Sequence, residues 1–188
     1  MTPTLNLANR LTILRICLVP LFIAALLYYT PEQAWLRPLA AGIYLLACLT
    51  DALDGYFARK MGQKTSFGSY IDPIADKLLL LSGYLSLSLL ANLPPEMRMP
   101  AWVTLIVISR DVMILTGAVI IYFTTGKLEP QPLFTGKITT VAQMAALFAS
   151  LVGLAWEARF SLYCVAIFFT LLSGVFYIRV GGRLFQES

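Results

Sequence analysis

Four aspartates within 26 residues are the part of this sequence best suited to chemistry: Asp51, Asp54, Asp72 and Asp76. Asp51 and Asp54 are three residues apart, and Asp72 and Asp76 are four apart. On a helix, both spacings place the two carboxylates on one face. Carboxylates that converge repel one another unless a cation lies between them, and hard oxygen ligands favour Mg²⁺ or Mn²⁺. The spacing therefore predicts a site for one or two divalent cations, of the kind that stabilises phosphoryl transfer.

The surrounding residues leave one structural alternative open. Cations lie close enough in sequence to pair with the acids in a solvated hairpin: Arg59, Lys60, Lys64 and Lys77. Such a hairpin does not need acids aligned on two facing helices, so we favour the metal site. Gly55 and Ala58 on the acid face, and Gly68, expected in the turn, would let a ligand approach closely. Arg59 offers a planar fork suited to a phosphate.

Histidine is absent from the chain. This absence excludes a Ser-His-Asp triad, a His-ligated zinc ion and a His-based phosphodiesterase. The three cysteines, Cys17, Cys48 and Cys164, lie far apart inside apolar runs, where we expect neither a disulfide nor a metal site.

Long apolar stretches must position these residues. Of 188 residues, 59% are hydrophobic and only 13% are charged. Six runs reach bilayer-spanning length: 11–29, 36–57, 70–91, 101–124, 138–156 and 160–178. The first is too long for a signal-peptide core and lacks a cleavage site, so we expect it in the mature protein. The sequence predicts an all-α integral membrane protein with six transmembrane helices, a single domain over 1–188 and a short interfacial helix at 5–10.

Lys and Arg are unevenly divided between the two sides of the expected bundle. An even number of spans places both termini on one side, together with ten of these residues: Arg10, Arg15, Arg59, Lys60, Lys64, Lys77, Lys127, Lys137, Arg179 and Arg183. Three fall on the other side: Arg37, Arg98 and Arg159. The positive-inside rule therefore predicts cytoplasmic termini and a cytoplasmic site, as in a bacterial inner membrane.

The segment DALDGYFARKMGQKTSFGSYIDPIAD carries a specific pattern, D(x)2DG(x)2AR(x)8G(x)3D(x)3D. This pattern resembles the signature of the CDP-alcohol phosphotransferase family at all eight fixed positions. The likeness covers nearly the whole chain, since that family has six membrane helices with the signature on the second and third.

The resemblance implies transfer of a phosphatidyl group from CDP-diacylglycerol to an alcohol, with release of CMP and dependence on two Mg²⁺ or Mn²⁺ ions. It implies that Asp51, Asp54 and Asp72 are metal ligands and that Asp76 is both ligand and general base. Gly55, Ala58, Arg59 and Gly68 would bind the CDP-lipid. A homodimer within membrane lipid is implied as well, and no nucleic acid is expected as a partner.

Polar residues outside the signature are candidates for the acceptor pocket. Arg110 lies inside the fourth run, where an ionisable side chain is costly, although a simple pair with Asp111 would also explain it. Lys137 begins the fifth run, and Arg15 lies on a polar stripe of the first. We expect Arg15, Arg110 and Lys137 to bind the acceptor.

Two branches of the family compete for the identity of the acceptor. ISRDVMIL and PQPLFTGKITTVAQ resemble segments of CMP-forming cardiolipin synthases, whereas NxLTxxR and GKxxT occur in phosphatidylglycerophosphate synthases too. The latter usually carry Glu after the fourth-span Arg and a second Arg eight residues beyond it, where this chain has Asp111 and Ala118. A dianionic glycerol 3-phosphate needs extra cationic donors. We therefore prefer phosphatidylglycerol as the acceptor, giving cardiolipin, and keep glycerol 3-phosphate as the alternative.

Proteins of another class also bury acids beside arginines. Ion-coupled transporters do so, but near the membrane midplane, on broken helices and with internal repeats. Here the acids lie at one end of the spans and no repeat is evident. A transporter is thus a remote alternative, and a non-catalytic scaffold is more remote still.

Overall fold

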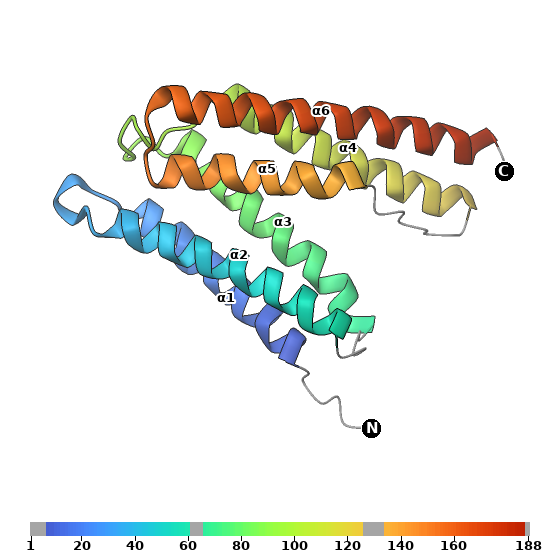
Figure 1. The fold of residues 1–188 in the computed structure, drawn as a ribbon, viewed down its shortest axis with the longest axis horizontal. Coiled ribbons are helices and arrows are strands. Elements are labelled where there is room, and N and C mark those ends of the chain that lie inside the picture. The colour runs from blue at the N-terminus through green and yellow to red at the C-terminus, as the bar shows by residue number, and fades with distance from the viewer. Residues whose placement is uncertain (1–6, 61–65, 126–133, 187–188) are drawn as a thin grey trace. The chain divides into compact units, whose positions relative to one another are not determined.

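The chain is all-helical over the residues that a computed structural model describes, which are 7–60, 66–125 and 134–186 (Figure 1). The helices of this part are α1 (Leu7–Leu27), α2 (Leu36–Lys60), α3 (Ser66–Leu89), α4 (Ala101–Thr125), α5 (Phe134–Leu151) and α6 (Trp156–Gln186). A short 3₁₀ turn, η1 (Pro31–Gln33), precedes α2, and the side chain of Thr30 caps it.

Most helix boundaries differ from the predicted runs by a few residues, and two regions need comment, the start of α1 and the break before α6. Residues 7–10 form the first turns of α1, so the described part of 5–10 continues into α1 rather than forming a separate interfacial helix. Trp156 begins α6 instead of ending the fifth span, and Glu157 and Arg159 belong to that helix. Charged residues at 157 and 159 did not mark the break, because helix termini readily carry charge. Gly153, with φ of +63°, lies in the break itself.

The chain divides into two compact units, the first comprising Met1–Arg98 with Ser150–Gly153. In this unit α1 packs along both α2 and α3, whereas the described parts of α2 and α3 contact each other at few positions. Phe22 of α1 and Tyr44 of α2 lie with ring centroids 5.8 Å apart, and both are buried. Helix α1 is therefore the scaffold on which the two acid-bearing helices are held.

One end of the first unit is closed by side chains that satisfy backbone carbonyls. The amide of Asn92 donates to three carbonyls at the end of α1, those of Leu26, Leu27 and Tyr29, at 3.0, 3.1 and 2.9 Å. Arg37 donates from Nε to the carbonyl of Leu151, at 3.2 Å. These bonds replace the helical partners that the last turn of a helix lacks.

The second unit comprises Met99–Ala149 with Leu154–Ser188. Here α4 packs on α6, and a Cβ added at Gly174 would lie 3.2 Å from Met113 Cε. Buried polar side chains join α5 to α6: Thr139 donates to the carbonyl of Phe169 at 2.9 Å, and Gln143 donates to Thr170 Oγ1 at 3.0 Å. Small and polar residues at such contacts are typical of membrane helix packing.

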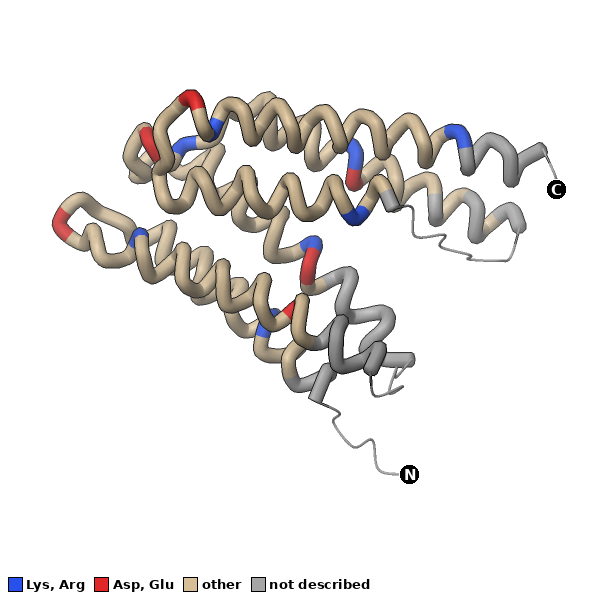
Figure 2. Tube along the Cα trace, in the orientation of Figure 1, with Lys and Arg blue, Asp and Glu red and all other residues tan. Residues whose placement is uncertain are grey.

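The described surface carries many large apolar side chains. Among the described residues, two helices have segments long and apolar enough to cross a membrane, Leu36–Leu53 and Trp156–Arg179, and a shorter apolar segment covers Leu11–Leu27. No charged residue lies between Arg37 and Asp51, and Figure 2 draws this stretch of α2 in tan. Phe123 is 81% exposed, and exposed apolar residues recur on α1, α2, α4 and α6. Such an exterior is typical of helices that face lipid, where water does not penalise exposed apolar surface.

Candidate active site

Two of the four predicted carboxylates converge on a single arginine in the first unit. Arg15 Nη1 lies 3.1 Å from Asp51 Oδ1 and donates a hydrogen bond to Asp76 Oδ1. Arg15 belongs to α1, Asp51 to α2 and Asp76 to α3. The arginine side chain is fully buried, whereas the two carboxylates are 34% and 27% exposed. The fold thus brings acids 25 positions apart in sequence to one cation, as expected if they share a site.

The remaining signature residues are placed by their helices alone. Asp54, Gly55, Ala58 and Arg59 lie on α2, and Asp72 lies on α3, with side chains outside the described part. Asp51, Gly55 and Ala58 follow at four- and three-residue steps, so helical geometry places them along one face of α2. Their assignment to metal and CDP-lipid binding stays a prediction.

The prediction for Gly68 requires a correction. We expected Gly68 in the turn, but α3 begins at Ser66 and includes it. A glycine near a helix start is a weak breaker, because its cost of about 1 kcal/mol applies to the helix interior. Gly68, Asp72 and Asp76 consequently lie at four-residue steps on one helix, which aligns the glycine with the acids.

The described residues supply two carboxylates, the donor type that a divalent cation prefers. Asp51 and Asp76 supply carboxylate oxygens from two helices to one positively charged partner, and both keep an exposed part. The described residues alone contain no group of three or more acids, cysteines or histidines that could hold a metal. A complete ligand set of hard oxygen donors would thus require Asp54 and Asp72 as well.

The second unit holds a buried arginine from the predicted acceptor set. Arg110 of α4 is 9% exposed, and its Nη1 lies 2.8 Å from Asp111 Oδ1. Its Nη2 donates to Ser173 Oγ of α6, and its guanidinium carbon lies 5.5 Å from the centroid of the Tyr177 ring. The pairing with Asp111, which we kept as the alternative explanation, is therefore present. Two α6 side chains also fix the guanidinium.

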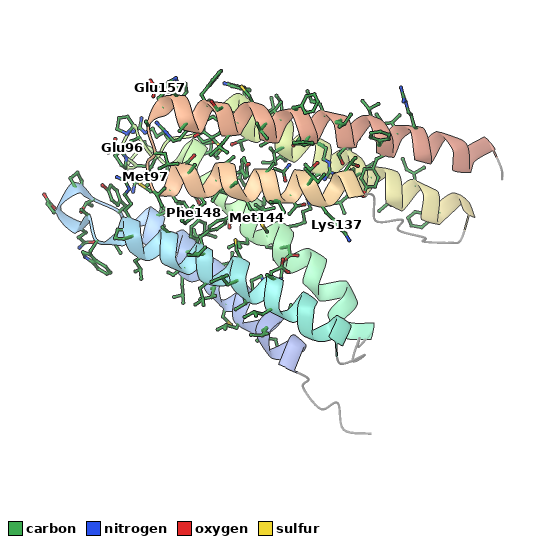
Figure 3. All side chains as sticks on the ribbon, viewed as in Figure 1. Glu96, Met97, Lys137, Met144, Phe148 and Glu157 are labelled. Carbon is green, nitrogen blue, oxygen red and sulfur yellow. The ribbon has the colours of Figure 1, made fainter. Side chains whose placement is uncertain are left out.

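The start of α5 approaches the same arginine. A Cβ added at Gly136 would lie 3.5 Å from Tyr177 Oη and 3.8 Å from Arg110 Nη2. Lys137 follows directly and is exposed near the beginning of α5 (Figure 3). Thr139 is fully buried and holds α5 to α6. Lys137 thus directly follows Gly136, whose backbone lies close to Arg110.

The predicted acceptor residues belong to different units. Arg15 is part of the first unit, and Arg110 and Lys137 are part of the second. Each unit is described by itself, and so the shared pocket stays a prediction.

Sequence reasoning missed two residues that hold Arg110. Ser173 and Tyr177 lie four positions apart on α6, and Ser173 is fully buried. A hydroxyl inside an apolar span was the available signal, but serines often bond only to their own helix, as Ser161 does to the carbonyl of Glu157. The contact with Arg110 crosses 63 residues and required the fold.

The first unit thus holds two of the signature acids, on two different helices, in contact with one buried arginine. The model of the CDP-alcohol phosphatidyltransferase family matches residues 5–174, and the chain belongs to this family. It is an enzyme, a phosphatidyltransferase, so the transporter and scaffold readings are excluded.

Curated relatives match along most of their length. A probable phosphatidylglycerophosphate synthase of Mycobacterium tuberculosis is 37% identical over 178 residues, which are 92% of this chain and 80% of the relative. A CDP-diacylglycerol–glycerol-3-phosphate 3-phosphatidyltransferase of Bacillus subtilis is 36% identical and covers 90% of this chain and 91% of its own. One from Salmonella typhimurium is 31% identical, with 92% and 93% covered.

Proposed function

We propose that this enzyme transfers the phosphatidyl group of CDP-diacylglycerol to glycerol 3-phosphate, giving phosphatidylglycerophosphate and CMP. The observation that carries the proposal is the similarity, over about nine tenths of both chains, to a relative named for this reaction. Other relatives with this name or with the name phosphatidylglycerophosphate synthase support it.

These relatives disfavour our preference for phosphatidylglycerol. That preference depended on Ala118, where a second arginine is missing. A dianion does not require its second cation at that position, since the start of α5 approaches Arg110 and carries Lys137. Arg110 and Lys137 together could supply two charge-assisted contacts to a phosphomonoester. We therefore propose these two residues as the acceptor-phosphate ligands.

Asp76 would act as the general base. Removal of the proton from the acceptor hydroxyl lets its oxygen bond to the phosphatidyl phosphorus. The phosphoanhydride bond then breaks, and CMP leaves with the bonding electrons. Arg59 would hold a phosphate of the donor. Asp51, Asp54, Asp72 and Asp76 would hold Mg²⁺ or Mn²⁺. When bound, the metal would supply positive charge that offsets the negative charge of the pyrophosphate.

The protein would work as one membrane-embedded domain. The family match spans both compact units, which supports a single domain over 1–188. The apolar exterior of α2 and α6 supports insertion, and six spans with cytoplasmic termini would expose the site to cytosolic glycerol 3-phosphate. A homodimer in the bacterial inner membrane is part of the same proposal.

An acceptor panel tests this function. Purified protein receives CDP-diacylglycerol and Mn²⁺ with glycerol 3-phosphate, phosphatidylglycerol or both, and CMP and lipid products are measured. We expect phosphatidylglycerophosphate as the main product, and no CMP after EDTA is added. Cardiolipin as the main product would overturn the acceptor assignment. Turnover that persists in EDTA would overturn the metal site.

A further inference from the structure

The contact between Arg15 and the two acids is not explained by acceptor binding. One guanidinium nitrogen serves carboxylates from two different helices, Asp51 on α2 and Asp76 on α3. Within their described parts, α2 and α3 contact each other at few positions, so the packing described there does little to fix how far apart these carboxylates lie. Arg15 comes from α1, the helix that packs against both.

Arg15 is more deeply buried than the carboxylates of Asp51 and Asp76. The guanidinium of Arg15 is fully buried, and Thr12, one turn earlier on α1, is also buried. The two carboxylates retain exposed surface. Arg15 therefore approaches them from the interior of the unit, and a ligand from solvent or from the lipid interface would approach from the opposite, exposed side.

We propose that Arg15 is a positioning residue for the metal site, an outer-sphere partner that orients Asp51 and Asp76 for a divalent cation. This proposal builds on the metal site of the proposed function and replaces the acceptor role predicted for Arg15. A carboxylate that accepts a bond from a fixed, buried donor loses orientational freedom before the cation arrives. Loss of such an outer partner typically weakens metal binding by about 10- to 100-fold.

Metal affinity measured without substrate tests the proposal. Mn²⁺ binding to the purified protein in nanodiscs is followed by isothermal titration and by the electron paramagnetic resonance signal of free Mn²⁺. We expect Arg15→Gln to bind Mn²⁺ about 10- to 100-fold more weakly. Arg15→Lys keeps the charge and can donate to both carboxylates, so it should lose less. Arg37→Gln is the matched control, because Arg37 belongs to the same unit but bonds to Leu151 and Val152 carbonyls.

Four results would overturn the proposal. Unchanged Mn²⁺ affinity in Arg15→Gln would show that the contact does not prepare the site, and tighter binding would show that Arg15 competes with the metal. If Arg37→Gln weakened Mn²⁺ binding as much as Arg15→Gln does, the loss of affinity would reflect a general loss of structure. If Arg15→Gln does not fold, Arg15→Lys is measured in its place. A raised acceptor KM in that variant, together with wild-type Mn²⁺ affinity, would show that Arg15 binds the acceptor. The Mn²⁺ affinities do not depend on which alcohol is the acceptor.

Discussion

At the residue scale, two buried arginines, Arg15 and Arg110, are each held by polar or aromatic side chains. Asp51 and Asp76 both contact Arg15. Arg110 contacts Asp111, Ser173 and Tyr177. A charged side chain inside a membrane has a high desolvation free energy, and hydrogen-bond or ion-pair partners offset part of it. Both clusters are therefore sites where a single substitution affects chemistry more than packing.

Asp76→Asn should abolish transfer while preserving the fold. Asparagine keeps a carbonyl oxygen that can accept from Arg15, but it cannot take the proton of the acceptor hydroxyl. We expect kcat to fall by about 10²- to 10⁴-fold, the usual contribution of a general base, with a smaller change in the KM for CDP-diacylglycerol. Steady-state kinetics of CMP release measures both constants.

Glu96→Gln is the matched control for this change. Glu96 pairs with Arg37 at 3.7 Å and is about half exposed, so its neutralisation should leave turnover near the wild-type rate. Normal turnover by Asp76→Asn would mean that the base lies elsewhere.

Ser173→Ala should weaken acceptor binding. The substitution removes one fixed partner of the buried Arg110 guanidinium, and a hydrogen bond to a charged group contributes about 1.5–3 kcal/mol. We expect the KM for glycerol 3-phosphate to rise by about tenfold or more, with the KM for CDP-diacylglycerol unchanged. Ser161→Ala, at an exposed serine of the same helix, should change neither constant. A selective rise in the donor KM would refute the acceptor assignment of Arg110.

At the element scale, the helices follow from apolar run lengths, and their ends follow from local chemistry. Arg37 and Gly153 show this at the closed end of the first unit. Gly153 has φ of +63°, and a Cβ added there would lie 1.9 Å from Arg37 Nη2. The same arginine donates to the carbonyl of Val152 at 2.5 Å. The backbone here turns where only glycine adopts the conformation at low cost.

Gly153→Ala should therefore destabilise the protein. The left-handed conformation costs an alanine about 1–2 kcal/mol, and displacement of Arg37 adds to this. We expect a lower temperature of thermal unfolding in detergent. Gly42→Ala is the control: Gly42 is exposed on α2 with nothing within 4 Å of an added Cβ, so helix propensity should make that change neutral or stabilising. Equal unfolding temperatures for the two variants would contradict this account.

The same elements show what sequence could and could not predict. Spacing alone predicted that Asp51 and Asp54 share one helix face and that Asp72 and Asp76 share another, because helical periodicity is a local property. The common contact of Asp51 and Asp76 with Arg15 joins residues 36 and 61 positions apart, and no local pattern carries it. The break before α6 was misplaced because charges at 157 and 159 resembled a loop, while the left-handed conformation of Gly153 was invisible in the sequence.

At the scale of the whole molecule, orientation in the membrane decides whether the site meets its substrates. A cytosolic phosphate ester reaches the acids only if the ends of α2 and α3 that carry them face the cytoplasm. The division of ten Lys and Arg residues against three predicts this orientation. In the first unit, Arg15, Asp51 and Asp76 converge, while Arg37 and Glu96 pair with each other near the start of α2. These two clusters should therefore lie on opposite sides of the bilayer.

Cysteine labelling in intact cells measures this orientation. In a background with Cys17, Cys48 and Cys164 replaced by alanine, single cysteines are introduced at Gln33, Lys64 and Lys127. An impermeant maleimide should label position 33, which is exposed in η1, and should label positions 64 and 127 only after the membrane is permeabilised. The reason is the uneven division of Lys and Arg, because segments flanked by more of these residues are retained on the cytoplasmic side. Labelling at 64 in intact cells, with none at 33, would invert the topology and place the four aspartates where no cytosolic acceptor could reach them.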